Sequence, residues 1–335
     1  MRDGSHPATA HVSLLLVVVV WAGAFSAIKV LLDHGTAPED IAILRYLVAA
    51  PGFAFLLWRA GGLPGLGRRD GLRILAAGAL VVGGYHISLN VGEGHTTAGT
   101  AALVVALAPA LTVALALGLR LERFSTARMI GIAIAFAGVA IVVLLGSGEE
   151  ISFANAKGPL IVLGAPLAFA LYNVLLMPLF RRYGVLALTA ATSLAGMVAL
   201  VPFARRSTLD GLFDTTGGDL SLILYLGIVC TLLGYIGWNV GLRGLGASRA
   251  VAYAYGIPPL AVLLGALVLD EPVTLWLALG GALVVAGVAL AQTPISPRAA
   301  VRRVLGARHR ARLGARRSEA AAPSAHAAEP PSRAR

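Results

Sequence analysis

Residues 12–32 read VSLLLVVVVWAGAFSAIKVLL, and Lys29 carries the only charge among them. A helix of about 20 apolar residues is long enough to cross the hydrocarbon core of a bilayer. The run is also longer than the apolar core of a secretory signal peptide, which has roughly 7–15 residues. We therefore predict that this stretch spans a membrane as a helix and is not a cleaved signal.

Nine further apolar runs of comparable length follow along the chain. The ten predicted spans cover residues 12–33, 38–58, 71–92, 97–118, 126–145, 158–180, 184–204, 220–241, 247–269 and 273–292. Their connections are short, and many contain Gly, Pro or charged residues. The predicted fold class is an all-α membrane protein with ten transmembrane helices.

The composition argues against a soluble globular protein. Of the 335 residues, 58% are hydrophobic and 13% are charged, whereas soluble domains carry about 25% charged residues. The net charge of +11 does not indicate a nucleic-acid partner, because ten of the 27 Lys and Arg residues follow Gln292 in a tail. The single cysteine, Cys230, excludes an intrachain disulfide and a Cys-based metal cluster. We expect the lipid bilayer as a partner and no metal or cofactor, and the oligomeric state stays open.

The distribution of Lys and Arg predicts the orientation of the spans. If the N-terminus is cytoplasmic, 22 of these residues fall in cytoplasmic segments and three, Lys157, Arg205 and Arg206, fall on the other side. Positive charge accumulates on the cytoplasmic side of membrane proteins. We therefore predict a multi-pass protein of the cytoplasmic (inner) membrane with both termini in the cytoplasm.

The tail, residues 293–335, is rich in Ala, Arg and Pro and has no run long enough to span. We expect it to be disordered and cytoplasmic, with a weak amphipathic helix near residues 299–313. Its arginines either fix the topology as a solvated tail or contact anionic lipid.

A shift of 149 residues aligns the two halves of the sequence without a gap. The matched pairs include Asn90–Asn239, Pro109–Pro258, Glu122–Glu271, Gly131–Gly280 and Gly138–Gly287. Because each half holds five predicted helices, the second half enters the membrane from the opposite side. We predict two inverted repeats, an arrangement typical of secondary transporters with a site near the bilayer midplane.

The repeat divides the chain into five parts. We predict a cytoplasmic N-terminus, a first five-helix repeat, an extracytoplasmic linker, a second five-helix repeat and the basic tail, at residues 1–11, 12–145, 146–157, 158–292 and 293–335.

Several short motifs accompany this pattern. They are Trp21-Ala-Gly-Ala-Phe25 with Lys29, Arg45-Tyr46, Ala98-Gly-Thr-Ala-Ala-Leu103, Leu119-Arg-Leu-Glu122 and Leu269-Asp-Glu-Pro272. With the ten-span, five-plus-five pattern, they resemble the EamA-type transporters of the drug/metabolite transporter superfamily over residues 12–292. The resemblance implies a small-molecule transporter and leans toward efflux of amino acids or similar metabolites.

Paired prolines mark candidate breaks in two spans. Pro109 lies in the fourth span, and Pro258 and Pro259 lie at the matching position of the ninth. A proline inside a helix removes one hydrogen bond and bends the helix. Paired breaks are typical of a transporter binding site, although a packing kink would also explain them.

Polar residues form a stripe on the third span and another on the eighth. His86, Asn90 and Glu93 share one helix face, and Tyr235 and Asn239 lie at the positions that match His86 and Asn90, with Trp238 beside them. Such stripes face away from lipid. They either line a substrate cavity or form interhelical hydrogen bonds. Tyr172, Asn173, Tyr253 and Tyr255 are further candidates for substrate binding.

Two cations lie inside predicted spans. Lys29 either pairs with Asp33 at i+4 or extends to the outer interface. Arg45 lies deeper, so it needs a partner. That partner is either structural, namely Glu93, Asp33 or a helix-end carbonyl, or a carboxylate of the substrate.

Three more groups have predicted roles. Glu122 and Glu271 lie just past the fourth and ninth spans, on opposite sides, and suit a gate or a loop anchor. His86 is the only histidine inside a predicted span, which makes it the candidate for coupling to a proton.

These patterns favour a secondary transporter that moves a small metabolite by alternating access. The chain has no HExxH, G-x-S-x-G or P-loop motif, so we do not expect an enzyme or an ATP-driven pump. Uptake or facilitative exchange by the same fold is the alternative, followed by a channel or a membrane sensor. Saturable flux into proteoliposomes separates a transporter from these.

The predicted topology is testable by cysteine labelling in intact cells, after replacement of Cys230 by Ser. Cysteines in residues 59–70 should be shielded from an impermeant reagent, and cysteines in residues 149–156 should be labelled, because of the charge bias. The reverse pattern would contradict the predicted orientation.

Overall fold

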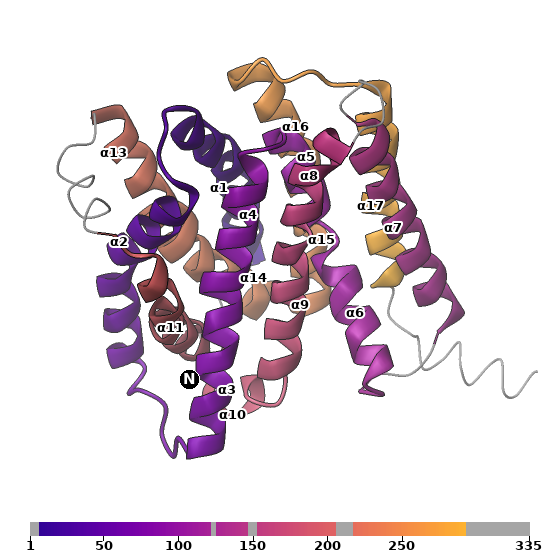
Figure 1. Cartoon of the computed structure of the whole chain (residues 1–335). Helices are drawn as coiled ribbons and strands as arrows, with labels where there is room; N and C mark the ends of the chain where they lie inside the picture. The colour runs from indigo at the N-terminus through magenta and orange to yellow at the C-terminus, as the bar shows by residue number, and fades with distance from the viewer. Residues whose placement is uncertain (1–6, 122–124, 147–152, 206–216, 293–335) are drawn as a thin grey trace, which may run out of the picture. The chain divides into compact units, whose positions relative to one another are not determined.

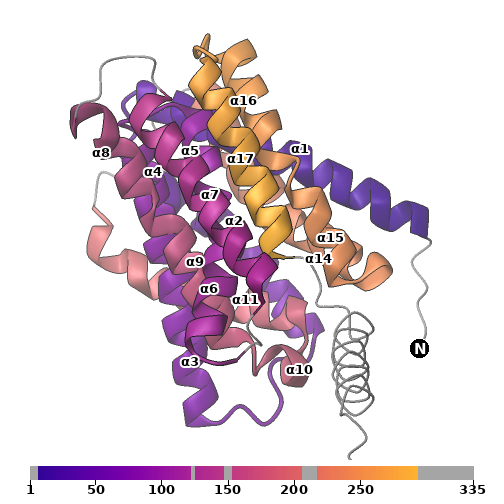
Figure 2. The ribbon, with the colours of Figure 1, turned by 90° about the vertical axis from the view of Figure 1, so that its right-hand side faces the viewer.

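The computed structural model describes residues 7–121, 125–146, 153–205 and 217–292, and every regular element within them is helical (Figures 1 and 2). The compact unit ends at Gln292. The predicted disordered tail and its amphipathic helix, and also Glu122, lie outside the described residues.

Nine stretches of the described chain are long and apolar enough to cross a membrane. They are Ala8–Asp33, Pro38–Arg59, Arg68–Glu93, Ala98–Gly118, Thr126–Leu145, Ala156–Leu176, Val185–Phe203, Gly217–Leu245 and Arg249–Val268. A further apolar helix, Leu275–Ala291, has 17 residues and falls just short of that length. The all-helical membrane fold is thus confirmed, with nine of the ten predicted spans at full length.

The helices up to residue 146 follow the predicted spans, with interruptions in two of them. Their bounds are α1 Pro7–Asp33, α2 Pro38–Arg59, α3 Arg68–Gly78, η1 Ala79–Tyr85, α4 His86–Glu93, α5 Ala98–Val105, α6 Ala108–Gly118 and α7 Thr126–Leu145. Segment η1 is a stretch of π-helix between α3 and α4.

The helices after residue 152 are interrupted more often. Their bounds are α8 Phe153–Val162, α9 Gly164–Leu176, α10 Phe180–Tyr183, α11 Val185–Gly196, η2 Met197–Phe203, α13 Gly217–Leu224, η3 Tyr225–Leu233, α14 Gly234–Leu245, α15 Ala247–Ala254, α16 Ile257–Val268 and α17 Leu275–Ala291. Segment η2 is a 3₁₀ helix and η3 is a second π-helix.

Local sequence signals explain several helix ends. Pro38 occupies the first turn of α2, where its missing N–H costs nothing, and Glu39 and Asp40 complement the helix dipole. Thr97 and Thr274 cap α5 and α17, because each hydroxyl accepts a hydrogen bond of 3.1 Å from the backbone N–H three residues later.

Helices α7 and α17 pack side by side through glycines (Figures 1 and 2). Gly131 lies against Gly287, and Gly138 lies against Gly280, at backbone distance in both cases. A Cβ atom on Gly131 would stand 2.3 Å from the backbone nitrogen of Ala291. Without side chains the two backbones approach closely, which is how helices associate when lipid removes the hydrophobic drive between them.

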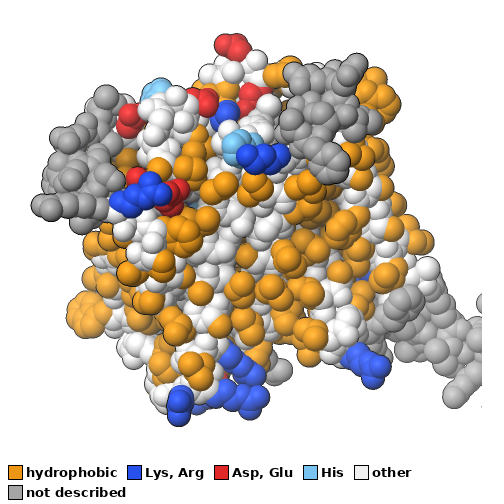
Figure 3. Space-filling model, viewed as in Figure 1, with side chains coloured by type: hydrophobic (Ala, Val, Ile, Leu, Met, Phe, Trp, Pro, Cys, Tyr) orange, Lys and Arg blue, Asp and Glu red, His pale blue; other side chains and the backbone are white. Residues whose placement is uncertain are grey.

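The remaining helices surround a core shared by both halves of the sequence. Helix α1 packs against α14 and α16, α2 against α11 and η3, α4 against α8, and α9 against η1 and α6. The largest fully buried side chains include Tyr46 and Phe53 of α2. On the face drawn in Figure 3, hydrophobic side chains cover the middle of the molecule and charged side chains gather toward its two ends. This surface fits a chain whose outer face contacts lipid.

The glycine contact predicts a large effect of a single methyl group. Gly138→Ala should destabilise the protein by about 1–3 kcal/mol, because the added Cβ would meet backbone atoms of Gly280 and Val284 at 2.7 Å. Gly71→Ala is the matched control, since nothing lies within 4 Å of its Cβ position. Thermal unfolding in detergent should show a lower melting temperature for the first variant only. Equal melting temperatures would contradict the close packing of α7 and α17.

Candidate functional site

The fourth and ninth spans are broken at matching positions. Helix α5 ends at Val105 and α6 begins at Ala108, while α15 ends at Ala254 and α16 begins at Ile257. The structure places Pro109 and Pro258 in the first turns of α6 and α16, and Pro259 directly follows. The prolines therefore begin new helices and do not bend continuous ones. In a first turn the missing N–H would have no partner within the helix.

The third and eighth spans each contain a π-helical segment, η1 and η3, which the sequence analysis did not predict. A π-helix has a wider turn, and such segments often mark functional sites. In both segments a backbone carbonyl accepts a hydrogen bond from a side chain. His86 Nδ1 lies 2.9 Å from the carbonyl oxygen of Val81, and Trp21 Nε1 donates to that of Cys230 at 2.9 Å.

Aromatic rings from both halves converge between these two segments. We call the following set the aromatic cluster: Trp21, Tyr46, Phe53, Tyr85, His86, Phe169, Tyr172, Tyr235 and Trp238. Its rings form two rows, with centroids 4.9–6.2 Å apart: Trp238–Trp21–Tyr235–Phe53 and Tyr46–His86–Tyr85–Phe169–Tyr172. The side chains of Tyr46 and Tyr235 interact and join the rows. Helices α1, α2, α4, α9 and α14 and segment η1 all contribute.

Arg45 is buried beside this cluster, with 8% of its surface exposed. Its Nε donates to the hydroxyl of Thr231 at 2.5 Å, and that hydroxyl donates to the carbonyl of Leu226 within η3 at 2.8 Å. In the described part of the chain, Arg45 takes part in no ion pair. The predicted structural partners Glu93 and Asp33 therefore do not pair with it, and Thr231 was not anticipated.

The residues of the two polar stripes are buried apart from Tyr235, which is half-buried, and the two asparagines bond in different ways. Asn90 Nδ2 donates to the carbonyl of Pro38, across to α2, at 2.9 Å. Asn239 Nδ2 donates to the carbonyl of Tyr235, one turn earlier in its own helix, at 3.0 Å. His86 and Tyr235 belong to the aromatic cluster, as does Trp238. The structure thus brings three of the predicted residues, His86, Tyr235 and Trp238, into one cluster, and Arg45 acts on the first two.

Tyr253 lies apart from the aromatic cluster. Its hydroxyl contacts the ring of His11 near the start of α1. Trp21, the cluster member on α1, is ten residues further along, which corresponds to about 15 Å of helix. Of the additional candidates, Asn173 bonds to the carbonyl of Phe169, and Tyr255 donates to the side chain of Gln292.

Charged groups meet at the end of the bundle where α1 and α4 end and α5 begins. Lys29 pairs with Asp33 at 3.1 Å, one of the two predicted alternatives. The carboxylate of Glu271 accepts hydrogen bonds from the backbone N–H groups of Ala98 and Gly99, at 2.6 and 3.1 Å. Glu271 therefore holds the start of α5, where the helix dipole favours negative charge.

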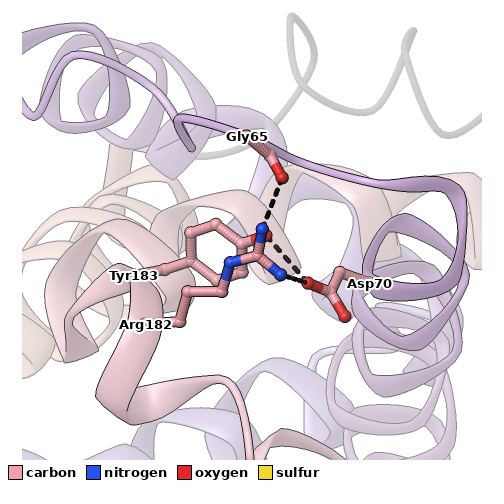
Figure 4. Close-up of polar contacts among 4 residues, drawn as sticks. All are labelled: Gly65, Asp70, Arg182 and Tyr183. Carbon is pink, nitrogen blue, oxygen red and sulfur yellow. Dashed lines mark hydrogen bonds and ion pairs between the residues drawn. The ribbon is translucent and has the colours of Figure 1, made fainter.

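A second polar network joins the halves at the opposite end (Figure 4). Arg182 donates to the carboxylate of Asp70 and to the carbonyl of Gly65, at 2.7 Å in both cases. The hydroxyl of Tyr183 donates to the same carboxylate oxygen at 2.9 Å. Burial and then this hydrogen bond raise the pKa of Tyr183. The network links the connection before α3 to α10.

Comparison with known proteins adds a family to this geometry. The model of the EamA-like transporter family matches residues 8–144 and 156–293. The chain belongs to the EamA-like transporter family. The relatives whose names state a role are transporters. This agrees with the apolar helices of the chain and with the absence of enzyme motifs in its sequence.

Three relatives in particular are similar over most of their length. An uncharacterized transporter of Archaeoglobus fulgidus is 34% identical over 82% of this chain and 95% of its own. A "probable terminal-alkyne amino-acid exporter" of Streptantibioticus cattleyicolor is 32% identical over 91% of this chain and 97% of its own. A "probable amino-acid metabolite efflux pump" of Salmonella typhimurium is 26% identical over 82% of this chain and 91% of its own.

A solved crystal structure has the same fold. It aligns with a TM-score of 0.56 over 85% of this chain and 96% of its own, at 20% sequence identity. Together with the family match, this establishes a transporter of EamA type in a multi-pass membrane fold.

Sequence reasoning missed Phe53, Tyr85, Phe169 and Thr231 as site residues, and named Trp21 and Tyr46 only as family motif residues. Tyr85 precedes His86, so its ring could have been noticed as an aromatic neighbour of a polar stripe. Phe169 and Thr231 carry no comparable signal, because each lies in an apolar run and reaches the site only through helix packing.

The network of Figure 4 predicts a difference between two acidic residues. Asp70→Asn should lower stability by about 2 kcal/mol, because hydrogen bonds to charged groups are worth roughly 1.5–3 kcal/mol. Glu39→Gln, in the solvent-exposed pair with Arg205, should cost less than about 1 kcal/mol. Thermal unfolding of both variants checks this order. The reverse order would show that the network around Asp70 contributes little to the stability of the protein.

Proposed function

We propose that this protein is a secondary transporter that exports an amino acid or a similar carboxylate-bearing metabolite across the cytoplasmic membrane. The observation that carries the proposal is Arg45, a buried cation without an ion pair in the described chain. A guanidinium binds a carboxylate through two parallel hydrogen bonds. Because Nε is engaged by Thr231, the two Nη groups are left for the substrate.

The aromatic cluster supplies the rest of the proposed site. Its rings offer an apolar surface for a side chain and π faces for a substrate ammonium group, which aromatic faces attract. We propose that Arg45, His86, Tyr235 and Trp238 contact the substrate. Lys29, Asn90 and Asn239 would line its path. Tyr253, beside His11, would contact the substrate only at the far end of that path.

The relatives support the substrate class and the direction. Two of them carry names that include amino-acid export or efflux, and both cover most of this chain. The alternatives of uptake and facilitative exchange use the same site, so only transport measurements separate them.

We further propose that the two halves are inverted repeats that exchange conformations. Under the shift of 149 residues, the contact of Gly131 with Gly287 maps onto that of Gly280 with Gly138. The breaks before α6 and α16 also coincide, and the two π-helical segments overlap. Two matched halves supply inward-open and outward-open states of similar energy, which alternating access requires.

The polar networks at the two ends are the proposed gates. Asp70, Arg182 and Tyr183 would close the cytoplasmic end, where the predicted topology places the Arg-rich connections. Glu271 on the start of α5 would close the other end.

Arg45→Gln tests the substrate assignment. We first screen L-amino acids for thermal stabilisation of the purified protein and compare each binder with its carboxamide. The wild-type protein should prefer the acid. Arg45→Gln should weaken binding of the acid by about 10–150-fold, because roughly 1.5–3 kcal/mol of charge-assisted hydrogen bonding is lost. Binding of the carboxamide should change little.

Thr231→Val is the control, because it removes the hydroxyl that holds Nε and keeps the guanidinium. Thr231→Val should weaken binding of the acid less than Arg45→Gln does. An equal loss for acid and carboxamide in Arg45→Gln would contradict a contact between Arg45 and the carboxylate. Counterflow in proteoliposomes with the same amino acid then tests transport and its direction.

A further inference from the structure

The carboxyl group of Glu93 is buried and has no partner among the described residues. Glu93 is the last residue of α4 and is 0% exposed, and neither of its side-chain oxygens has a hydrogen-bond partner in the described part of the chain. The oxygen Oδ1 of Asn90 is in the same state one turn earlier on the same helix face. A charged carboxylate is strongly disfavoured in such a place, because burial removes its water and nothing replaces it.

The neighbouring charges are already committed to other groups. Those that act on Glu93 are Glu271, Lys29 and Asp33, and the hydroxyl of Tyr85 is also within electrostatic reach. Lys29 pairs with Asp33, and Glu271 holds the start of α5. From α2, α5, α8 and α9, which also pack against α4, no described side chain adds a charge to this set. The carboxylates of Glu271 and Asp33 disfavour a further negative charge at Glu93, and the cation of Lys29, which favours it, is paired with Asp33.

The chemistry of the place selects a proton over a metal cation. A calcium ion takes about six to eight oxygen ligands. Here three buried oxygens are free, two on Glu93 and one on Asn90, and the ammonium of Lys29 is close enough to repel a cation. Among the described residues, no group of three or more His, Cys, Asp and Glu side chains is arranged to hold a metal. A proton needs a single carboxylate oxygen.

We propose that Glu93 is the proton-binding site that couples this transporter to a pH gradient. The inference rests on the proposed alternating access. When the end of the bundle near Glu271 opens, water reaches Glu93 and the carboxylate takes up a proton from that side. The end then closes over the neutral acid, which leaves Glu93 buried as it is in the structure. When the other end opens, the O–H bond breaks and the proton leaves to the cytoplasm, while substrate moves the opposite way.

This assignment differs from the sequence-based candidate for coupling, His86. Its Nδ1 bonds to the carbonyl of Val81, and its ring packs edge-on against the rings of Tyr46 and Tyr85. In addition, the cation of Arg45 acts on this imidazole and opposes a second positive charge. His86 is thus suited to a role as a neutral member of the aromatic cluster, whereas Glu93 has buried oxygens to which a proton can bind.

The first test needs no substrate. The melting temperature of the wild-type protein should fall as pH rises from 5 to 8, because a carboxyl that is neutral in the folded state loses that advantage as protons become scarce. Glu93→Gln mimics the neutral acid and should reduce this fall by about 3 °C or more. Glu93→Asp keeps an ionisable group and should retain the fall, and so should Glu39→Gln at the same end. A wild-type slope in Glu93→Gln would overturn the proposal.

The second test measures coupling in proteoliposomes, with the L-amino acid that binds most tightly in the screen above as the probe. Glu93→Gln should still exchange labelled for unlabelled probe, since exchange moves no net proton. Accumulation driven by a pH gradient should drop to its level without a gradient. Accumulation that persists in Glu93→Gln would overturn the coupling role. If no L-amino acid binds, the proposed function fails, and the melting experiment still decides the state of Glu93.

Discussion

Polar groups inside a membrane have to find their partners within the protein, because lipid offers no hydrogen bonds. The structure satisfies this constraint first with helices, whose backbones are self-sufficient. Where the helices are irregular, side chains complete the bonding: Trp21 reaches a carbonyl of η3, and His86 one of η1. Arg45 and Glu93 stand out against this background. Within the residues that the structure describes, one is a buried cation without an anion, and the other is a buried acid without a donor. Both are polar groups that a ligand would complete.

The scaffold is nearly symmetric under the shift of 149 residues, but its chemistry is not. The glycines between α7 and α17 and the breaks before α6 and α16 all have counterparts. The three polar residues that carry the proposals have apolar counterparts in the other half. Leu194 matches Arg45, Leu242 matches Glu93, and Val82 matches Thr231. A packing surface can be used twice by two similar halves. A single substrate and a single proton each need only one binding group.

Sequence alone determined those features that depend on local chemistry. Apolar length predicted the spans, since burial in lipid requires a certain number of consecutive residues. The i, i+4 spacing of Lys29 and Asp33 gave their ion pair as one of two alternatives for Lys29, because residues one turn apart are neighbours on any helix. The paired prolines marked the two places where a span is interrupted, although the sequence predicted bends there and the structure has new helix starts. Periodicity also identified His86, Asn90 and Glu93 as one inward face.

Tertiary structure decided which groups meet on that inward face. Arg45 bonds to Thr231, 186 residues away, and Glu271 bonds to Ala98, 173 residues away. Helical periodicity states that a side chain points inward, but contains no information on the neighbouring helix, its depth or its rotation. The rings of Tyr85 and Phe169 converge for the same reason. Only the packed structure showed that Glu93 lacks a hydrogen-bond partner among the described residues. This can be seen only when the positions of all the surrounding described side chains are known.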